Sequence, residues 1–270
     1  MTKKIIIAIM VLSMMITFVG CSKPATNNDD GADKLAKIKS KGKIVLGTSA
    51  DYPPYEFHKL INGKDEIVGF DIEIAKHIAE DLGVELEIVD MKFDGLLAAL
   101  VTDDIDFVVA GMVADEERSK TVDFSIPYYG GNQKLMVRKE DSSKLKGPED
   151  FKNLSIGVQK STTQEAIAVE QFTDAEIIGL SKITDLVLEL KNNKVDGIVL
   201  AEPVIAAYLV QNPDLYMAEV LLGTEEGVSV GVNKGNAALL ESINGTLDKL
   251  IKDKKIDKLI QEATALADTE

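Results

Sequence analysis

Ile105-Asp106-Phe107-Val108-Val109-Ala110 and Val195-Asp196-Gly197-Ile198-Val199-Leu200 are two apolar runs that match at an offset of about 90 residues. Each run follows a segment of helical pattern, and Leu100 and Leu190 hold the same position in those two segments. A nearly unbroken apolar run is typical of a strand buried on both faces in a parallel sheet. Two interpretations stay open: a chance likeness between two helix–turn–strand units, or two α/β lobes built alike.

The rest of the chain alternates in the same way between short apolar strands and amphipathic helices. Apolar residues recur at helical spacing in 71–82, and Gly83 then stops the helix. Residues 84–89 alternate apolar and acidic side chains, as a strand with one wet face does. By the same criteria we expect strands at 44–46, 154–158 and 228–232, and helices at 95–101, 186–191, 237–252 and 256–267.

These elements predict an α/β fold with two open sheets. The second lobe is expected to begin after Gly131, and the two C-terminal helices are expected to pack back on the first lobe. The first lobe then consists of residues 37–131 and 233–270, and the second of residues 132–232. Such a discontinuous lobe requires a hinge of two crossing strands.

The N-terminus has the pattern of an export signal. Lys3 and Lys4 precede an apolar run over 5–19, which is too short for a comfortable membrane span. Gly20-Cys21 resembles a bacterial lipobox, with Phe18 at a position where leucine is usual. We predict a signal peptide over 1–20, a lipidated Cys21 and a flexible tether over 21–36. The alternative is an ordinary signal peptide or a short anchor.

Composition excludes several classes of function. The formal net charge is −15, and the only charged residues before Cys21 are two lysines, so nucleic acid is not an expected partner. Cys21 is the only cysteine, which rules out a disulfide within the chain. With two histidines and no second cysteine, neither a zinc nor a haem site is expected. We expect a monomer without cofactor or metal.

Candidate binding residues gather where predicted strands end. Ligands of open parallel sheets bind beyond the carboxyl ends of the strands. Four such ends are expected here, at 49–52, 110–113, 160–164 and 201–203. Together they offer an aromatic ring, a glycine, several hydroxyl groups and an acid, and Arg118 follows closely after Gly111.

This set of side chains suits a zwitterion. A carboxylate is bound by a guanidinium and backbone N–H groups, which Arg118 and the amides of Val113 and Thr163 supply. An ammonium group is bound by a carboxylate and a carbonyl, for which Glu202 and Gly111 are the candidates.

Aromatic rings complete the candidate site, and each of its residues also has a plainer interpretation. Tyr52 and Phe93 would sandwich the ligand's side chain. The plainer roles are core packing for these rings, a local ion pair for Arg118, and helix capping for Glu202 before Pro203, Asp71 and Asp94.

A series of motifs along the chain carries a resemblance to a known family. In order they are 47–57, 68–72, 93–100, 110–112, 117–118, 122–125, 127–129, 161–165 and 202–204. From about residue 43 to about residue 262 the chain resembles the polar amino-acid substrate-binding proteins of ABC importers. The resemblance implies a two-lobed fold of the periplasmic-binding-protein type (type II) that closes on an amino acid.

The resemblance also implies roles for individual residues. They are Arg118 for the ligand carboxylate, Glu202 for its ammonium, Tyr52 and Phe93 as platforms, and Thr162, Thr163 and Gln164 as second-lobe amide and hydroxyl groups. Ser49, Ala110, Gly111 and Val113 complete the predicted site. Val113 stands where members commonly have Thr or Ser. Ser49 stands where several binders of basic amino acids have an acid, which argues against lysine or arginine.

The function that follows is a lipid-anchored receptor outside the cytoplasmic membrane of a bacterium. It would bind a free polar amino acid of basic or amide type and deliver it to an ABC permease in the membrane. Two alternatives stay open. A cleft enzyme of dehydratase type would use Glu202 and Lys160 as an acid–base pair. A sensory subunit would pass ligand occupancy to a receptor instead of a permease.

Overall fold

The computed structural model describes residues 33–225 and 227–269. The predicted signal peptide, Cys21 and the tether as far as residue 32 lie outside the described residues. The predicted tether extends to residue 36, whereas helix α2 (Lys34–Lys41) already begins at Lys34. The Asp33 side chain caps this helix by accepting a hydrogen bond from the Leu35 amide (3.3 Å). Residues 34–36 therefore belong to the folded body.

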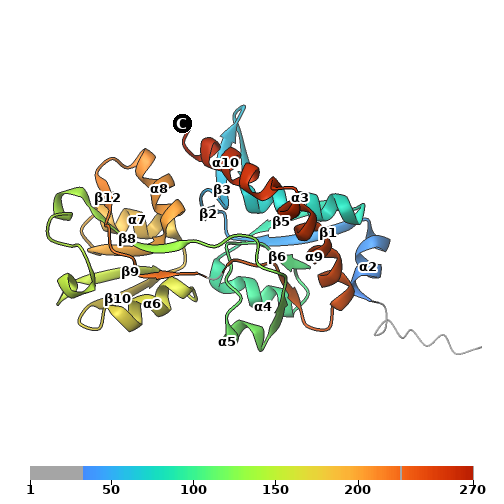
Figure 1. The fold of residues 1–270 in the computed structure, drawn as a ribbon, viewed down its shortest axis with the longest axis horizontal. Helices are drawn as coiled ribbons and strands as arrows, with labels where there is room; N and C mark the ends of the chain where they lie inside the picture. Colours follow the sequence, from blue (N-terminus) through green and yellow to red (C-terminus); the bar gives the residue numbers. More distant parts are fainter. Residues whose placement is uncertain (1–32, 226, 270) are drawn as a thin grey trace, which may run out of the picture. The chain divides into compact units, whose positions relative to one another are not determined.

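Two sheets of the same construction lie in two lobes (Figure 1). The first has the spatial order β5 (Glu85–Asp90), β1 (Lys43–Thr48), β6 (Phe107–Val108), β14 (Gly231–Asn233) and β7 (Val122–Phe124). The second has the order β10 (Glu176–Leu180), β9 (Ser155–Gln159), β11 (Gly197–Ala201), β8 (Asn132–Arg138) and β12 (Leu215–Met217), with β13 (Gly223–Thr224) also on β8. In each sheet the first three strands are parallel and the fourth is antiparallel. The predicted two-lobed α/β fold is confirmed.

The match at an offset of 90 residues has a structural counterpart. Asp106 Oδ2 accepts a hydrogen bond from the Val45 amide (2.9 Å), at the start of β1. Asp196 Oδ2 accepts one from the Ser155 amide (2.9 Å), at the start of β9. Each aspartate thus ties the end of a helix–turn unit to the strand beside it. The predicted strand at 105–110 is shorter in the structure, where only Phe107 and Val108 form β6.

Helices cover the sheets and contribute many of the buried apolar side chains. They are α3 (Phe70–Leu82), α4 (Leu96–Val101), α5 (Glu116–Ser119), α6 (Thr163–Gln171), α7 (Ile183–Lys191), α8 (Glu202–Gln211), α9 (Ala237–Lys252) and α10 (Lys255–Ala267), with 3₁₀ turns η2 (Phe93–Gly95), η3 (Lys139–Asp141) and η4 (Pro148–Phe151). Gly83 ends α3 in the left-handed conformation (φ 70°), as predicted. Helix α9 packs on α3, where Thr246 Oγ1 donates to Asp81 (2.7 Å), so the C-terminal helices return to the first lobe.

A small third sheet was not predicted. It consists of β2 (Asp51–Tyr52), β3 (Glu56–Ile61) and β4 (Lys64–Val68). The turn between β3 and β4 is Asn62-Gly63, with φ values of 52° and 77°. Two consecutive positive φ angles are typical of a type I′ turn, for which Asn-Gly is the preferred pair. The Asn-Gly pair was the signal that would have revealed this hairpin.

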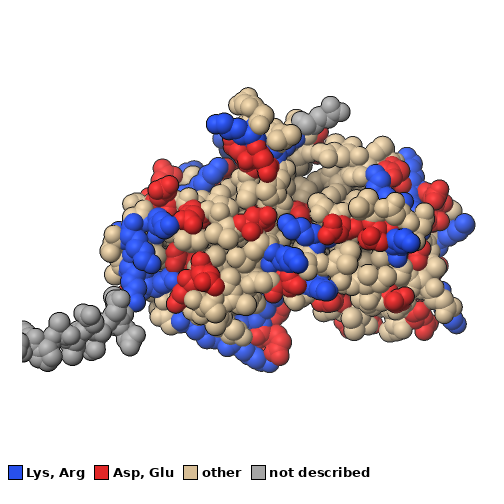
Figure 2. Space-filling view, turned by 180° about the vertical axis from the view of Figure 1, so that it is seen from behind, with Lys and Arg blue, Asp and Glu red and all other residues tan. Residues whose placement is uncertain are grey.

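Charged side chains of both signs are interspersed over the face shown in Figure 2. Several pair within one helical turn, among them Lys76 with Glu73 (2.7 Å) and Lys258 with Glu262 (3.3 Å). Exposed pairs of this kind contribute only about 0.2–1 kcal/mol each, so stability rests on the buried side chains. In the part of the chain that the structure describes, no helix has the length and apolar character needed to cross a membrane.

Two chain segments cross between the lobes and form the predicted two-strand hinge. One, residues 125–131, leads from β7 to β8, and the other, including residues 227–230, leads from β13 to β14. They lie side by side, because Val228 pairs with Tyr129 and with Val113, and the Tyr128 amide donates to the Val228 carbonyl (3.0 Å).

Asp71 links this hinge to the first lobe. Its fully buried carboxylate accepts hydrogen bonds from the Gly111 amide (2.8 Å) and the Tyr128 hydroxyl (2.8 Å), and it shares a hydrogen bond with the carboxyl group of Glu56. The predicted helix cap at Asp71 is wrong: the N-cap of α3 is Gly69, and no side chain caps the helix. Asp71 is instead turned inward as a structural acceptor.

Glu56 and Asp71 form a buried pair that holds a proton. Burial raises the pKa of Asp71 to about 6 and raises the pKa of Glu56 well above its ordinary range. Asp71 already accepts from two donors, whereas Glu56 Oε2 has no hydrogen-bond partner within residues 33–225 and 227–269. We therefore assign the proton to Glu56 and the negative charge to Asp71.

Replacing Glu56 by Gln tests this assignment. A carboxyl group that stays protonated in the folded state lowers the free energy of unfolding by about 1.4 kcal/mol per pH unit once the unfolded carboxyl ionises. The amide of Glu56→Gln does not ionise, so the free energy of unfolding of this variant does not fall in this way. The variant should therefore gain stability relative to the parent chain as pH rises above about 4.5, by roughly 2–3 kcal/mol at pH 6.5.

Urea unfolding at a series of pH values measures this difference. Glu66→Gln, at an exposed position of the same hairpin, is the matched control, and its difference from the parent should stay small. If the free energy of unfolding changed with pH in the same way in the parent and in Glu56→Gln, the assignment of a proton to the Glu56–Asp71 pair would be contradicted.

Candidate functional site

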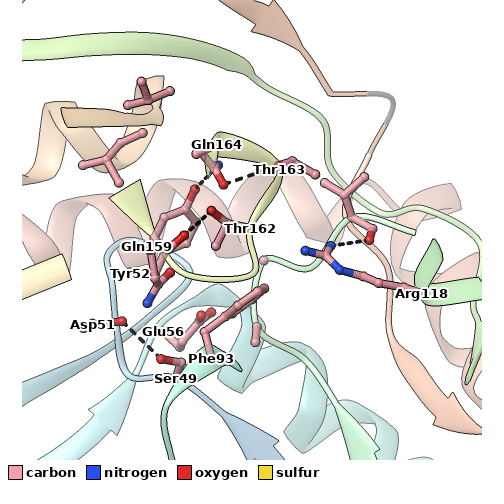
Figure 3. A pocket seen from close by; sticks show the side chains of 15 residues that line it. Ser49, Asp51, Tyr52, Glu56, Phe93, Arg118, Gln159, Thr162, Thr163 and Gln164 are labelled. Carbon is pink, nitrogen blue, oxygen red and sulfur yellow. Dashed lines mark hydrogen bonds between the residues drawn. The ribbon is translucent and has the colours of Figure 1, made fainter. Parts of the chain in front are cut away.

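A cavity lies where the carboxyl ends of the parallel strands of both lobes meet (Figure 3). From the first lobe it is lined by Ser49, Asp51, Tyr52, Glu56, Phe93, Ala110, Gly111, Val113 and Arg118. From the second lobe it is lined by Gln159, Thr162, Thr163, Gln164, Val199 and Leu200. The structure thus brings together every residue of the predicted site except Glu202. In Figure 3, Arg118 enters from one side, and Ser49 and Asp51 lie on the other.

Arg118, on α5, is held by neighbours on three of its nitrogen atoms. Nε pairs with Asp115 (3.2 Å), one terminal nitrogen donates to the Val113 carbonyl (2.7 Å), and the other donates to the Ser161 carbonyl (2.7 Å). The guanidinium also lies 5.6 Å from the centre of the Phe93 ring. A guanidinium has five N–H groups, so two stay available for a ligand. The local ion pair and a ligand contact are therefore compatible.

The N-terminus of α6 faces the same cavity. Thr162 is the N-cap, and its hydroxyl accepts from the Glu165 amide (3.2 Å) and donates to the Gln159 carbonyl (2.6 Å). The Thr162 hydroxyl is thereby committed to the helix. Thr163 is the first helical residue, and unpaired N–H groups in the first turn favour an anion. A carboxylate beside Arg118 would be stabilised by both features.

Tyr52 and Gly111 shape the wall of the cavity. The Tyr52 ring packs against Tyr55, with 5.0 Å between ring centres, and its hydroxyl accepts from Gln164 Nε2 (3.2 Å). Gly111 has a φ of +54°, and a Cβ there would lie 3.0 Å from the Tyr52 ring. Only glycine fits this backbone so close to the ring.

Acidic side chains on the side away from Arg118 were not among the predicted site residues. Asp51 Oδ2 accepts from the Ile183 amide (2.8 Å), and Oδ1 accepts from the Ser49 hydroxyl (3.3 Å). Strand alternation suggests that Asp51 turns away, but β1 ends at Thr48 and β2 starts a new strand at Asp51. Glu56 also lines the cavity, and in the part of the chain that the structure describes its buried Oε2 has no hydrogen-bond partner.

Glu202 is the one predicted site residue that does not line this cavity. Strand β11 ends at Ala201, and Glu202 begins α8, where it accepts from Asn132 Nδ2 (2.9 Å). Glu202 lines a separate hollow with Tyr129 and Asn132. It is not the cap of α8 either, because the N-cap position is Ala201. Lys160 is exposed, so the Glu202–Lys160 pair considered for an enzyme is not assembled in the cavity.

Direct contacts hold the two lobes together around the cavity. Besides the bonds of Arg118, Tyr52 and Asp51 described above, Ser181 Oγ donates to Asp94 (3.3 Å) and Lys182 pairs with Asp90 (3.5 Å). The cap predicted for Asp94 is wrong, because the N-cap of α4 is Gly95. The lobes are thus in a closed arrangement. Among the described residues, no group of three or more His, Cys, Asp or Glu side chains is placed to hold a metal ion.

Comparison with known proteins gives consistent matches over almost the whole folded body. Residues 44–264 match the family model of bacterial extracellular solute-binding proteins, family 3. The arginine-binding extracellular protein of Bacillus subtilis is 33% identical over 233 residues, which is 85% of this chain and 89% of that protein.

Solved structures agree with this match. An amino acid ABC transporter substrate-binding protein of Streptococcus pneumoniae, bound to L-arginine, is 36% identical with a TM-score of 0.84, covering 87% of this chain and 99% of that one. An ancestral amino-acid-binding protein, described as a precursor of cyclohexadienyl dehydratase, is 34% identical with a TM-score of 0.77, covering 86% and 100%. The family model spans most of the two lobes described above, and the chain belongs to the bacterial extracellular solute-binding proteins of family 3.

Proposed function

We propose that this chain is the substrate-binding protein of an amino-acid ABC importer and takes one free amino acid between its lobes. The observation that carries the proposal is a cavity with two unlike ends. Among the described residues, Arg118 keeps two N–H groups without a partner at one end, and Glu56 has an unpartnered acceptor oxygen at the other. An α-carboxylate suits the first end, and a side chain with N–H donors suits the second. The proposed contacts are the residues that line this cavity.

We propose arginine as the first ligand to test. Ser49 supplies no acid, but Asp51 and Glu56 place two carboxyl groups at the side-chain end of the cavity. A guanidinium donates from several N–H groups at once and suits such an environment better than an apolar side chain does. The two arginine-related proteins above support this choice. An amide side chain, as in glutamine, is the alternative ligand.

Closure of the lobes is the proposed signal to the importer. Contacts such as Tyr52 with Gln164 exist only when the lobes meet, and a ligand that touches both lobes favours the closed state. A ligand that contacts one lobe alone binds the open and closed states equally, so it does not shift the equilibrium between them. The closed form would then present its surface to the permease.

We also propose the organisation that surrounds this core function. Residues 1–20 act as a signal peptide, and Cys21 carries lipid and holds the chain, as a monomer, outside the cytoplasmic membrane. The proposed lobe boundaries are 37–131 with 233–270, and 132–232. Acyl chains contribute about 0.8 kcal/mol per buried CH₂, so more than one chain is needed for stable anchoring.

A cleft enzyme is the second candidate, because one similar protein is a precursor of a dehydratase. The enzyme hypothesis lacks its predicted acid–base pair, because Lys160 and Glu202 do not line the cavity. A sensory subunit is the third candidate and shares the cavity. Transfer of bound ligand to a permease would distinguish the transport protein from the sensory subunit.

Thermal unfolding with a panel of amino acids tests the proposed function. The purified protein is denatured and refolded to remove carried ligand, then melted with each of the common amino acids. A ligand at about 1,000 times its dissociation constant stabilises the folded state by roughly 4 kcal/mol. We expect arginine to raise Tm by several degrees, followed by other polar amino acids. The proposal fails if no amino acid raises Tm.

Arg118→Ala should weaken binding of the selected amino acid by about 100-fold or more, because it removes the cation proposed to face the carboxylate. Arg118→Lys keeps a charge but loses the planar pair of N–H groups, so an intermediate loss is expected. Isothermal titration calorimetry measures both. Lys120→Ala, at an exposed lysine two residues away, is the matched control. Affinity of Arg118→Ala equal to that of Lys120→Ala would remove Arg118 from the site.

Cys21→Ser tests the proposed anchor in the full-length chain expressed in a bacterium. The parent chain should incorporate a labelled fatty acid and sediment with membranes, whereas Cys21→Ser should do neither, because it lacks the thiol that carries the lipid. Ser22→Ala is the control and should behave like the parent. A Cys21→Ser chain that still incorporates the label would contradict lipidation at this cysteine.

A further inference from the structure

Helix α8 of the second lobe contacts the first lobe outside the ligand cavity. The hydroxyl of Tyr208, on this helix, donates to the main-chain carbonyl of Asp51 (2.9 Å). Asp51 belongs to strand β2 of the first lobe, so this hydrogen bond crosses between the lobes. Tyr208 does not line the ligand cavity. The bond therefore joins the lobes through protein atoms alone.

The Tyr208 hydroxyl is suited to this contact. Burial and the negative charge of Asp51 raise the pKa of Tyr208, so the hydroxyl keeps its proton at neutral pH and stays a donor. When the lobes separate, water replaces the partner that each group loses. The net strength of such a bond corresponds to about a 3- to 10-fold change in the equilibrium between closed and open lobes.

The start of helix α7 makes a second contact to the same strand. The N-cap position of α7 is Lys182, and within the described residues its side chain makes no capping bond. The Asp51 carboxylate, from the other lobe, accepts from the amide of Ile183 (2.8 Å), in the first turn of α7. Amides in the first turn of a helix have no acceptor within the helix. Closure of the lobes therefore supplies an acceptor for one of them.

An apolar cluster extends this interface. Ala207, next to Tyr208 on α8, packs in one cluster with Phe57 of β3, Val68 of β4 and Ala267 at the end of α10. All four of these side chains are buried. Figure 1 shows α8, β3 and the end of α10 together at the boundary between the lobes. Closure thus removes apolar surface from water at a place that no ligand in the cavity reaches.

This interface is separate from the ligand cavity. Tyr208 and Ala207 line a different hollow, together with Lys182 and Thr184 of the second lobe. Of the described residues that line the two spaces, only Asp51 borders both. The acceptor for Tyr208 is the main-chain carbonyl of Asp51 and not its carboxylate. Removal of the Tyr208 hydroxyl therefore takes no side chain out of the cavity.

We propose that Tyr208 is a positioning residue that favours the closed arrangement of the lobes and thereby raises the affinity for every amino acid that the cavity binds, without contacting it. This inference rests on the proposed function and adds to it a residue outside the cavity. The apparent affinity of a ligand falls with the population of the state that is competent to hold it. Loss of the Tyr208 bond therefore weakens the binding of different amino acids by the same factor.

Calorimetry of Tyr208→Phe tests this proposal, because phenylalanine keeps the ring and removes only the hydroxyl. The probes are L-arginine and L-glutamine, or the two amino acids that raise Tm most if the thermal panel ranks others higher. Both should bind about 3- to 10-fold more weakly than to the parent, and by the same factor. Tyr216→Phe, at an exposed tyrosine of the second lobe, is the matched control and should bind both like the parent.

Kinetics separate a contact of the closed state from a merely structural role. A bond that exists only between closed lobes slows the release of a bound amino acid and leaves its first encounter with the open lobes unchanged. Release of tritiated L-arginine into an excess of unlabelled L-arginine should therefore be faster in Tyr208→Phe by about the same 3- to 10-fold. The association rate should equal that of the parent.

Three outcomes would overturn the assignment and leave the proposed function intact. Unchanged affinity for both amino acids, with or without a lower Tm, would show that the Tyr208 hydroxyl only supports packing. A loss confined to one of the two amino acids would make Tyr208 part of the cavity. Slower association with unchanged release would place its effect in the open state. A parent protein that binds no amino acid in the thermal panel would overturn the proposed function and this inference together.

Discussion

The buried carboxylate of Asp71 is the constraint on which the rest of the binding region depends. It accepts from the Gly111 amide, which fixes the loop after β6, and from the Tyr128 hydroxyl, which fixes the first crossing segment. Its third partner, Glu56, reaches the cavity. A single negative charge inside the first lobe therefore sets the position of the cavity wall relative to the hinge. Such a charge is tolerated because every contact made to it is a hydrogen-bond donor.

The two sheets explain why a cavity forms where it does. Each is built in the same order, and each receives as its fourth strand a segment that enters from the other lobe: β14 in the first sheet and β8 in the second. The antiparallel strand is thus both a member of its sheet and the continuation of the hinge. The parallel strands β1, β6, β9 and β11 then direct their carboxyl ends toward the same space. Binding residues gather there because topology, rather than proximity along the chain, brings them together.

The sequence was a good guide to whatever depends on local patterns. Hydrophobic spacing predicted helices α3, α4, α7, α9 and α10 and strands β1, β5, β9 and β11, but it did not indicate α2 or α6. The aspartates of the repeated unit, Asp106 and Asp196, make equivalent bonds. It was a poor guide to the direction of single side chains at strand ends. Glu202 begins α8 and lines a separate hollow, and Asp71 is an inward acceptor instead of a cap.

Closure and recognition use the same side chains, which has a thermodynamic consequence. Arg118 donates to the Ser161 carbonyl across the lobes, and Tyr52 accepts from Gln164 across the lobes, while both residues line the cavity. The closed state is therefore stabilised by protein contacts before any ligand arrives. The free energy by which a ligand favours closure is the difference between its binding free energies for the closed and open states. Contacts to both lobes at once make that difference large. Because Arg118 is already held by Asp115 and the Val113 carbonyl, little side-chain entropy is lost when a carboxylate binds to it.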